Sequence, residues 1–284
     1  MAILPCIQLI FNFKCLILVD KMGFQQILAQ KTGLPPEVLP NSYQILGHVL
    51  LLKLLDKKAL KHKKAIGNTI LKISPNIHTV CLQKGVAGEF REPKIEVIAG
   101  IKQTETVHQE LNCIFSLDVA KIMWSKGNHF EKKRMISVVK PNEIIVDMFA
   151  GVGYWSIPIA KHTKAGKIYA IEKNKTAFDY LKQNIRANYI TNIIPILGDC
   201  RKVVNRLEKA DRIIMGYFPN TLKFLPVALK ISKKGTIIHL HELASDLKKL
   251  TKEIWKYKVK IMRVREVKEY SPSKRHYVFD LSVL

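Results

Sequence analysis

The stretch Glu143–Ser156, EIIVDMFAGVGYWS, decides the fold, because a short apolar strand in it ends at an acid and leads into a glycine turn. The residues Glu143–Asp147 predict a buried strand, and the residues after the turn predict a helix. Gly151 and Gly153 allow the backbone to approach a ligand closely where that helix begins. This order of strand, glycine turn and helix is typical of α/β proteins that bind a nucleoside-containing ligand.

Further strands alternate with helices on the C-terminal side of this stretch. The apolar runs that predict them are Lys167–Glu172, Ile193–Leu197, Asp211–Met215, Thr236–His241, Val259–Glu266 and Tyr277–Val283. Strands alternating with helices at this spacing predict an α/β fold with a parallel, doubly wound sheet. Because ligands of such sheets bind beyond the carboxyl ends of the strands, the residues that end each strand are the candidates for a site.

Acids stand at the ends of the first three strands. Glu172 comes about 20 residues after Gly153, where a carboxylate accepts hydrogen bonds from ribose hydroxyls, and Asp199 can accept from the amine of adenine. Taken singly, a pair of glycines is more often a turn than a site, and a strand-end acid is often a helix cap. Together and in register they predict a nucleoside cofactor site that comprises Asp147, Phe149, Ala150, Gly151, Gly153, Glu172, Asp199 and Cys200.

The turn differs from that of dinucleotide-binding proteins. Ser156 stands where their fingerprint has a third glycine, and no basic residue follows the loop to bind a pyrophosphate. An NAD-dependent dehydrogenase is therefore disfavoured. The pattern D-x-F-A-G-x-G, followed by an acid after the second strand and an Asp after the third, resembles the class I S-adenosylmethionine enzymes over residues 140–242.

Composition restricts the class of protein further. The chain has 284 residues, 48% of them hydrophobic, and a formal net charge of +24, so nucleic acid or an anionic membrane surface is expected as a partner. The five cysteines form no CxxC pair and have no metal-ligand spacing, which indicates reduced thiols, a cytoplasmic location and no metal site. A secreted disulfide-rich protein, a collagen-like chain and a multi-pass membrane protein are excluded.

Residues 2–19, AILPCIQLIFNFKCLILV, are mostly apolar. They lack the leading positive charge and the cleavage site of a signal peptide, and Lys14 would cost about 2.5–3.5 kcal/mol inside a membrane. A membrane anchor, a first buried strand pair and a mis-extended start with Met22 as the internal alternative remain open. We expect no stable membrane association, and deletion of these residues is expected to leave a soluble, active protein.

The sequence predicts three parts, which are an apolar N-terminal segment over residues 1–37, a small α+β domain over 38–120 and the α/β domain over 121–284. In the small domain, Tyr43–Leu55 predicts a strand-like run with a turn or bulge at Gly47. A lysine-rich helix is predicted over Lys57–Leu71.

Longer motifs resemble one known family. In the α/β domain they are KIMWSKGNHFEKKRM (residues 121–135), VDMFAGVGYWSIPIA, AIEKN, GD and DRIIMGY, and before it PNSYQILGHVLLLKL, PNIHTV, GEFREPKIEVIAG and TETVHQE. In combination they resemble the tRNA position-37 modification family over residues 38–284. This family comprises the archaeal and eukaryotic guanine-37 N1-methyltransferases and the related wybutosine-pathway 3-amino-3-carboxypropyltransferases.

Two places separate the branches of this family. The methyltransferases have an arginine where Gly127 stands, and an Asn-Pro-Pro or Asn-Leu-Pro loop after the fourth strand, where this chain has Met215–Pro219, MGYFP. Both places resemble the aminocarboxypropyl branch. This branch usually has Arg where Lys132 stands. A lysine offers a carboxylate a point charge in place of the two-pronged contact of an arginine, a loss that Arg134 can compensate.

The resemblance implies an enzyme that transfers the 3-amino-3-carboxypropyl group of S-adenosylmethionine to 4-demethylwyosine at position 37 of tRNA(Phe) and releases methylthioadenosine. It also implies that Ser125 and Lys132 contact the methionine part of the cofactor or its surroundings. The alternative is an S-adenosylmethionine-dependent guanine-37 N1-methyltransferase. No general base can be assigned, because His239, His241 and Glu242 at a strand end are better explained by packing and capping.

The expected partner is tRNA, bound by a monomer. The lysines of 57–64 and the basic run over 248–265 are expected to track its phosphates. The predicted base-stacking residues are Tyr154, Trp155 and Tyr217, although Trp124 and Trp155 fit a core equally well. A non-catalytic RNA-binding module is disfavoured, because it would require a defective cofactor pocket and the strand-end acids are intact.

Overall fold

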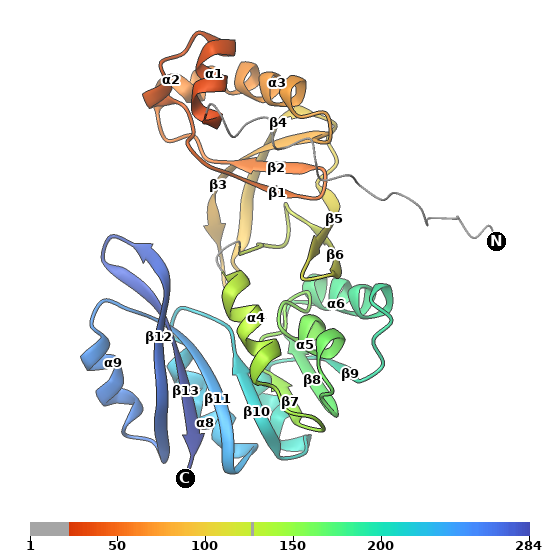
Figure 1. Cartoon of the computed structure of the whole chain (residues 1–284), viewed down its shortest axis with the longest axis vertical. Helices are drawn as coiled ribbons and strands as arrows, with labels where there is room; N and C mark the ends of the chain where they lie inside the picture. Colours follow the sequence, from red (N-terminus) through yellow and green to blue (C-terminus); the bar gives the residue numbers. More distant parts are fainter. Residues whose placement is uncertain (1–22, 126–127) are drawn as a thin grey trace, which may run out of the picture. The chain divides into compact units, whose positions relative to one another are not determined.

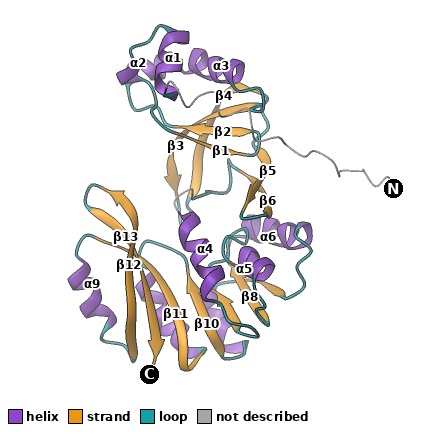
Figure 2. Ribbon diagram, viewed as in Figure 1, coloured by secondary structure: helices purple, strands orange, loops and turns teal. Residues whose placement is uncertain are grey.

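The structure, a computed structural model, describes residues 23–125 and 128–284, and its contacts divide the chain into two compact units (Figures 1 and 2). Among the described residues, the first unit comprises 23–87 and 93–106, and the second comprises 88–92, 107–125 and 128–284. The apolar segment 2–19 and Gly127 lie outside the described residues. Within the described ranges, no helix is long and apolar enough to cross a membrane.

A four-stranded sheet packed against helices forms the described part of the first unit. Its strands, in sheet order, are β1 (Tyr43–Leu46), β2 (Val49–Leu52), β3 (Thr79–Ala87) and β4 (Glu92–Gly100). The helices are α1 (Phe24–Thr32), the short 3-10 helix η2 (Pro36–Val38), α2 (Lys57–Lys61) and α3 (Lys63–Ile73). Apolar residues of α1, α3, β2 and β3 form one core.

The run 43–55 forms two antiparallel strands, because Gly47 adopts a φ of +54° and turns the chain. The turn predicted at Gly47 is thereby confirmed. The lysine-rich helix that follows is more interrupted than predicted. The helix predicted over 57–71 ends at Lys61 and starts again at Lys63, with His62 between the two pieces. The prediction of a single helix was therefore wrong at His62.

The second unit is built on a seven-stranded sheet with the order β12-β13-β11-β10-β7-β8-β9 among the described residues. Its strands are β7 (Ile144–Asp147), β8 (Lys167–Glu172), β9 (Ile193–Leu197), β10 (Ala210–Met215), β11 (Ser232–Ala244), β12 (Val259–Ser271) and β13 (Lys274–Val283). The pair β5 (Glu105–Glu110) and β6 (Cys113–Asp118) precedes them.

Helices cover both faces of this sheet. They are α4 (His129–Val138), α5 (Ser156–His162), α6 (Lys175–Ala187), α7 (Cys200–Val203), α8 (Leu225–Lys230) and α9 (Leu247–Ile254), with 3-10 turns η4 (Val204–Arg206) and η5 (Thr221–Phe224). In Figure 1, α4 and α5 lie on the near face and α8 on the far face. The buried central strands β7 and β10 thus have apolar side chains toward both layers.

The sheet is mixed at one edge. The strands from β11 to β9 are parallel, as predicted, but β13 is antiparallel to both β11 and β12. Only Pro272 and Ser273 separate β12 from β13, too few residues for the crossover that a parallel neighbour requires. The prediction of a wholly parallel sheet was therefore wrong at this hairpin.

Asn184 of α6 and Asn188, the C-cap residue of this helix, form hydrogen bonds with the backbone of β6 as a neighbouring strand would. Asn184 accepts from the Ser116 N–H at 2.7 Å and donates to the Ser116 carbonyl at 3.2 Å. Asn188 makes the same pair of bonds with Ile114, at 2.8 and 2.7 Å. The spacings match, because four residues of helix rise about 6 Å and two residues of strand about 6.8 Å. Fully buried Asn184 also donates to the Val152 carbonyl at 3.0 Å, in the turn after β7.

We predict that Asn184→Ala lowers the free energy of unfolding by about 2–4 kcal/mol, because it leaves three backbone groups in a buried place without partners. Chemical denaturation measures the effect. Gln183→Ala, one residue away on the exposed side of the same helix, is the matched control and should cost less than about 0.5 kcal/mol. Equal losses in the two variants would refute the role of the amide.

Candidate active site

A cavity of about 260 Å³ lies in the second unit at the carboxyl ends of β7, β8, β9 and β10. This is the edge of the sheet at which the sequence places the site. The predicted residues that line the cavity are Phe149, Gly151, Tyr154, Glu172, Asp199, Cys200 and Tyr217.

The carboxylate of Glu172 holds two turns of the cavity wall. Its Oε2 accepts from the Gly151 N–H at 2.7 Å, and its Oε1 accepts from the Asn174 N–H at 2.6 Å. Gly151 has a φ of +57°, and a Cβ there would lie less than 3.0 Å from the Tyr154 ring. Burial raises the pKa of Glu172, while backbone N–H groups oppose the shift. Each oxygen keeps acceptor capacity for a ribose hydroxyl.

Asp147, Ala150 and Gly153 support the turn from beneath and do not line the cavity. Fully buried Asp147 accepts from the Ser156 hydroxyl at 2.6 Å and from the Phe149 N–H at 3.3 Å. Burial raises the pKa of Asp147 to about 7, against these hydrogen bonds. Asp147 thus stabilises the turn, and its predicted contact with a cofactor stays a prediction.

Asp199 and Cys200 form the wall beyond β9. Asp199 caps α7 and accepts from the backbone N–H and the guanidinium of Arg201, with the Lys173 ammonium at 3.6 Å. These cations, Arg201 above all, hold the pKa of Asp199 well below its usual range, so the carboxylate is ionised. Burial raises the pKa of Cys200 to about 12, so its thiol is neutral at pH 7.

Aromatic rings form the opposite wall. The rings of Phe149 and Tyr217 stack with centroids 5.1 Å apart, and Phe224 meets Phe149 edge-on at 5.0 Å. The Tyr154 hydroxyl donates to the Met123 carbonyl at 2.6 Å, so that ring is fixed beside the turn. Trp155 is only 2% exposed and does not line the cavity, in keeping with the core alternative for this residue.

Lys132 and Ser125 do not line the cavity either. Lys132 is 2% exposed on α4, where its ammonium pairs with Glu110 and lies 4.6 Å from the centre of the Trp124 ring. Burial lowers the pKa of Lys132, and Glu110 opposes the shift. The Ser125 hydroxyl accepts from the Lys268 ammonium at 3.2 Å.

Arg134 is not free to replace the cation at position 132. Its guanidinium binds both oxygens of Asp280, at 2.8 and 3.0 Å, and pairs with Glu131. The interaction holds α4 to β13. Arg134 is therefore committed to Asp280 and Glu131, and the role that the resemblance implies for Lys132 stays a prediction.

Glu242 binds the backbone of the loop after β10. From the sequence, this residue is explained by packing and capping at a strand end. Its two oxygens accept from the Asn220 N–H at 2.9 Å and from the Leu222 N–H at 2.8 Å. Buried His239 and His241 do not line the cavity, and burial lowers the pKa of both, so they are neutral at pH 7. Within the described residues, no group of three His, Cys, Asp or Glu side chains could hold a metal ion.

Several residues of the wall were not among the predicted site residues. They are Glu89, Phe90, Arg91, Lys121, Ile122, Met123, Met148, Lys173, Asn174, Ala177, Gly198, Arg201, Gly216, Lys223 and Phe224. Arg201 carried a local signal, since it directly follows Cys200, and Gly216 was singled out only as a mark of the branch. The segments 89–91 and 121–123 lie in stretches that carry the family resemblance, but no local signal placed them at the sheet edge, because tertiary structure brings them there.

Comparison with known proteins decides the family. The model of the TRM5/TYW2 methyltransferase domain matches residues 106–268, and that of the TYW2 N-terminal domain matches residues 24–104. The chain belongs to the TRM5/TYW2 family. The family membership and the fold class predicted from the sequence are thereby confirmed.

The similar proteins include both TYW2 aminocarboxypropyltransferases and Trm5 proteins. A Methanocaldococcus jannaschii protein named tRNA(Phe) (4-demethylwyosine(37)-C(7)) aminocarboxypropyltransferase is 45% identical over 204 residues, which are 69% of this chain and 81% of the relative. The crystal structure of P. horikoshii TYW2 in complex with MeSAdo superposes with a TM-score of 0.76 at 34% identity, covering 91% of this chain and 98% of that one. The complex of aTrm5 and tRNALeu gives 0.81 at 32% identity, covering 94% and 77%.

Gly216 gives a packing test of the wall. A Cβ at this position would lie less than 3.0 Å from Nε1 of the buried Trp155 ring. We predict that Gly216→Ala lowers the free energy of unfolding by about 1–3 kcal/mol, and that Trp155→Phe relieves part of this loss. A double-mutant cycle measured by denaturation should show coupling above about 0.5 kcal/mol, whereas additive effects would contradict the contact.

Asp147 gives a pH test. Its folded pKa of about 7 lies above the ordinary value of 3.8, so its contribution to stability is full below pH 3.8 and is lost as the pH rises through 7. Relative to Asp147→Asn, the wild-type protein should therefore lose on the order of 1–3 kcal/mol of unfolding free energy between pH 4.5 and 8. Denaturation curves at several pH values measure this difference. A constant difference would refute the raised pKa.

Proposed function

We propose that this chain transfers the 3-amino-3-carboxypropyl group of S-adenosylmethionine to C7 of 4-demethylwyosine at position 37 of tRNA(Phe), and releases methylthioadenosine. The observation that carries the proposal is the strand-end cavity closed by the Gly216-Tyr217 loop, in a chain similar over most of its length to proteins with that name. The neighbouring structures in complex with MeSAdo and AdoMet support the same cofactor.

The residues of the wall fit the nucleoside part of this substrate. Glu172 would accept from the ribose hydroxyls, and Asp199 from the adenine amine, because both carboxylates line the cavity on neighbouring strand ends. The stacked rings of Phe149 and Tyr217 offer an apolar face beside them. Gly151 leaves room for close approach of the backbone.

The transfer forms a bond between C7 of the base and the γ-carbon of the aminocarboxypropyl group. The bond between that carbon and the sulfonium sulfur breaks, the sulfur keeps the electron pair, and C7 loses its proton. The same sulfonium also carries a methyl group, so the enzyme selects its reaction by presenting one carbon in line with the base. A wall fixed by Glu172 and Glu242, each binding two backbone N–H groups across a turn, is suited to such positioning.

Methyl transfer to guanine-37 is the second candidate. Its support is the similarity to methyltransferases of the family, among them the aTrm5 complex with tRNALeu. Against it stands the loop after β10, which has Gly216 and Tyr217 and lacks the Asn of that branch.

Product analysis separates the two candidates. Purified protein is incubated with S-adenosylmethionine and either unmodified tRNA(Phe) with guanine-37 or tRNA(Phe) carrying 4-demethylwyosine. We expect methylthioadenosine with the second tRNA only. S-adenosylhomocysteine with the first tRNA would overturn the proposal in favour of methyl transfer.

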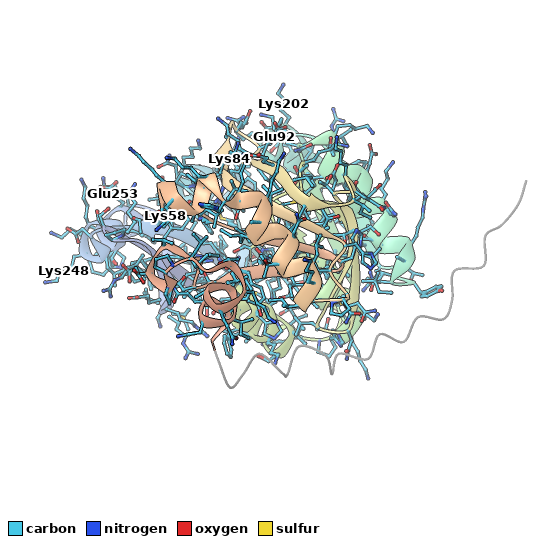
Figure 3. All side chains as sticks on the ribbon, turned by 90° about the horizontal axis from the view of Figure 1, so that it is seen from above. Lys58, Lys84, Glu92, Lys202, Lys248 and Glu253 are labelled. Atoms are coloured by element: carbon cyan, nitrogen blue, oxygen red, sulfur yellow. The ribbon has the colours of Figure 1, made fainter. Side chains whose placement is uncertain are left out.

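We further predict that Glu172→Gln weakens binding of S-adenosylmethionine by at least about tenfold, because an amide cannot accept from both backbone N–H groups and from the ribose. Isothermal titration calorimetry measures the affinity without turnover. Glu253→Gln on α9, whose exposed side chain is labelled in Figure 3, is the matched control and should bind normally. Normal binding by both variants would remove Glu172 from the site.

A further inference from the structure

Two cations of the second unit, Lys268 on β12 and Arg91 in the 88–92 turn, have no acidic partner among the described residues. Other cations that are shielded from solvent in this unit do pair with carboxylates. These pairs are Lys132 with Glu110, Arg134 with Asp280, Arg212 with Glu143 and Arg265 with Glu131. The two unpaired cations therefore need another explanation.

Lys268 is surrounded by groups that cannot neutralise it. Its ammonium donates to the Ser125 hydroxyl at 3.2 Å, and its partner across the ladder is His276. Burial, followed by Lys268 itself, lowers the pKa of His276 to about 4, so this ring is neutral at pH 7. The pairing of β12 is irregular on both sides of Lys268, a type of local distortion that redirects side chains next to functional sites.

Arg91 is held firmly by neutral groups. Its guanidinium donates to the Phe218 carbonyl at 3.2 Å and to the Tyr270 hydroxyl at 3.4 Å, and it lies 5.1 Å from the centre of the Phe218 ring. Arg91 also lines the cavity. Its φ of +54° is uncommon for a residue with a side chain, so the turn holds the guanidinium at some conformational cost.

The contacts of the two cations bring them to the same place. Arg91 donates to Tyr270, two residues along β12 from Lys268. The Phe218 ring under the Arg91 guanidinium lies 4.6 Å from the ring of His276, the ladder partner of Lys268. Burial and then the charge of Arg91 lower the pKa of Lys268. A partly buried ammonium beside a guanidinium is unfavourable for folding unless an anion shares the place. Binding of an anion beside both cations would offset this repulsion.

We propose that Lys268 and Arg91, together with the Ser125 hydroxyl, bind a phosphodiester group of the RNA whose base enters the neighbouring cavity. This inference rests on the proposed action on tRNA. RNA is favoured over the carboxylate of the cofactor because Phe90, next to Arg91 in the chain, and Tyr270, whose hydroxyl accepts from Arg91, are each 44% exposed and offer rings on which bases can stack. Lys268 itself lies outside the cavity that the nucleoside would fill.

The test measures binding of tRNA(Phe) to the full chain by Lys268→Met, in the presence of methylthioadenosine and at several KCl concentrations. We expect the dissociation constant to rise about tenfold, as for loss of one charge-assisted hydrogen bond. The slope of log affinity against log salt should fall by about 0.7–0.9, the value for one phosphate contact. Lys268→Arg should retain most of the affinity.

Lys274→Met removes an exposed lysine of the same hairpin and is the matched control. An equal loss in this control would overturn the proposal, because it would show a general effect of charge. Arg91→Asn is the second variant, since asparagine tolerates a positive φ, and it should reproduce the loss even if Lys268→Met is unstable. Unchanged tRNA binding by Arg91→Asn would also overturn it.

A comparison of two small ligands distinguishes the source of the anion. S-adenosylmethionine carries a carboxylate that methylthioadenosine lacks, so a weaker affinity of Lys268→Met for the first ligand alone would assign the site to the cofactor and overturn the proposal. Equal affinities of the variant and the wild type for both ligands are expected. Because these readouts need no turnover, they are separate from failure of the proposed reaction, which appears as absence of methylthioadenosine.

Discussion

The hydrogen bond from the Gly151 N–H to the Glu172 carboxylate joins the turns that follow β7 and β8, and the cavity depends on it. Without this bond, the turn after β7 would be held mainly by the hydrogen bonds of Asp147 to Phe149 and Ser156. The same carboxylate accepts from Asn174, so one buried acid fixes the beginning of α6 as well. Further along the chain, the asparagine of α6 binds β6 and the Val152 carbonyl, which closes the arrangement around the turn.

A second group of charged side chains joins α4 to the strands β10, β11 and β13. Arg134 of α4 binds Asp280 of β13, and Asp280 lies 2.6 Å from His239 of β11. Arg212 of β10 in turn contacts His239 and pairs with Glu143. These groups are mutually satisfied and lie away from the cavity wall, so they serve to fix α4 and the strand order. Buried charge alone therefore does not mark the active site in this chain.

The sequence allowed the sheet and the strand ends to be predicted, because apolar runs and turn residues are local signals. Phe149, Gly151, Glu172 and Asp199 line the cavity as expected, since the ends of parallel strands meet at one edge. Side-chain direction within the turn was not predictable. Asp147 turns under the loop because the Ser156 hydroxyl binds it there, an interaction that depends on the helix start.

Other features depended on distant parts of the chain. The pairing of Asn184 with Ser116 joins positions 68 residues apart, and the periodicity of α6 gives no sign of it. The resemblance places Lys132 at the methionine part of the cofactor or its surroundings, and no local signal indicated that Glu110 and the Trp124 ring would enclose it. The antiparallel direction of β13 followed from the shortness of its connection, a local signal that was available and was outweighed by the strand–helix alternation.

The loop after β10 shows how a small residue and a buried acid can act together on selectivity. Gly216 lets the backbone lie against the Trp155 ring, because a side chain at this position would overlap it. Glu242 then binds the next turn of the loop from β11, through the N–H groups of Asn220 and Leu222. Tyr217, between these two supports, is held in its stack on Phe149. A wall supported on both sides suits discrimination between two carbons on one sulfonium, since both are electrophilic and only their placement differs.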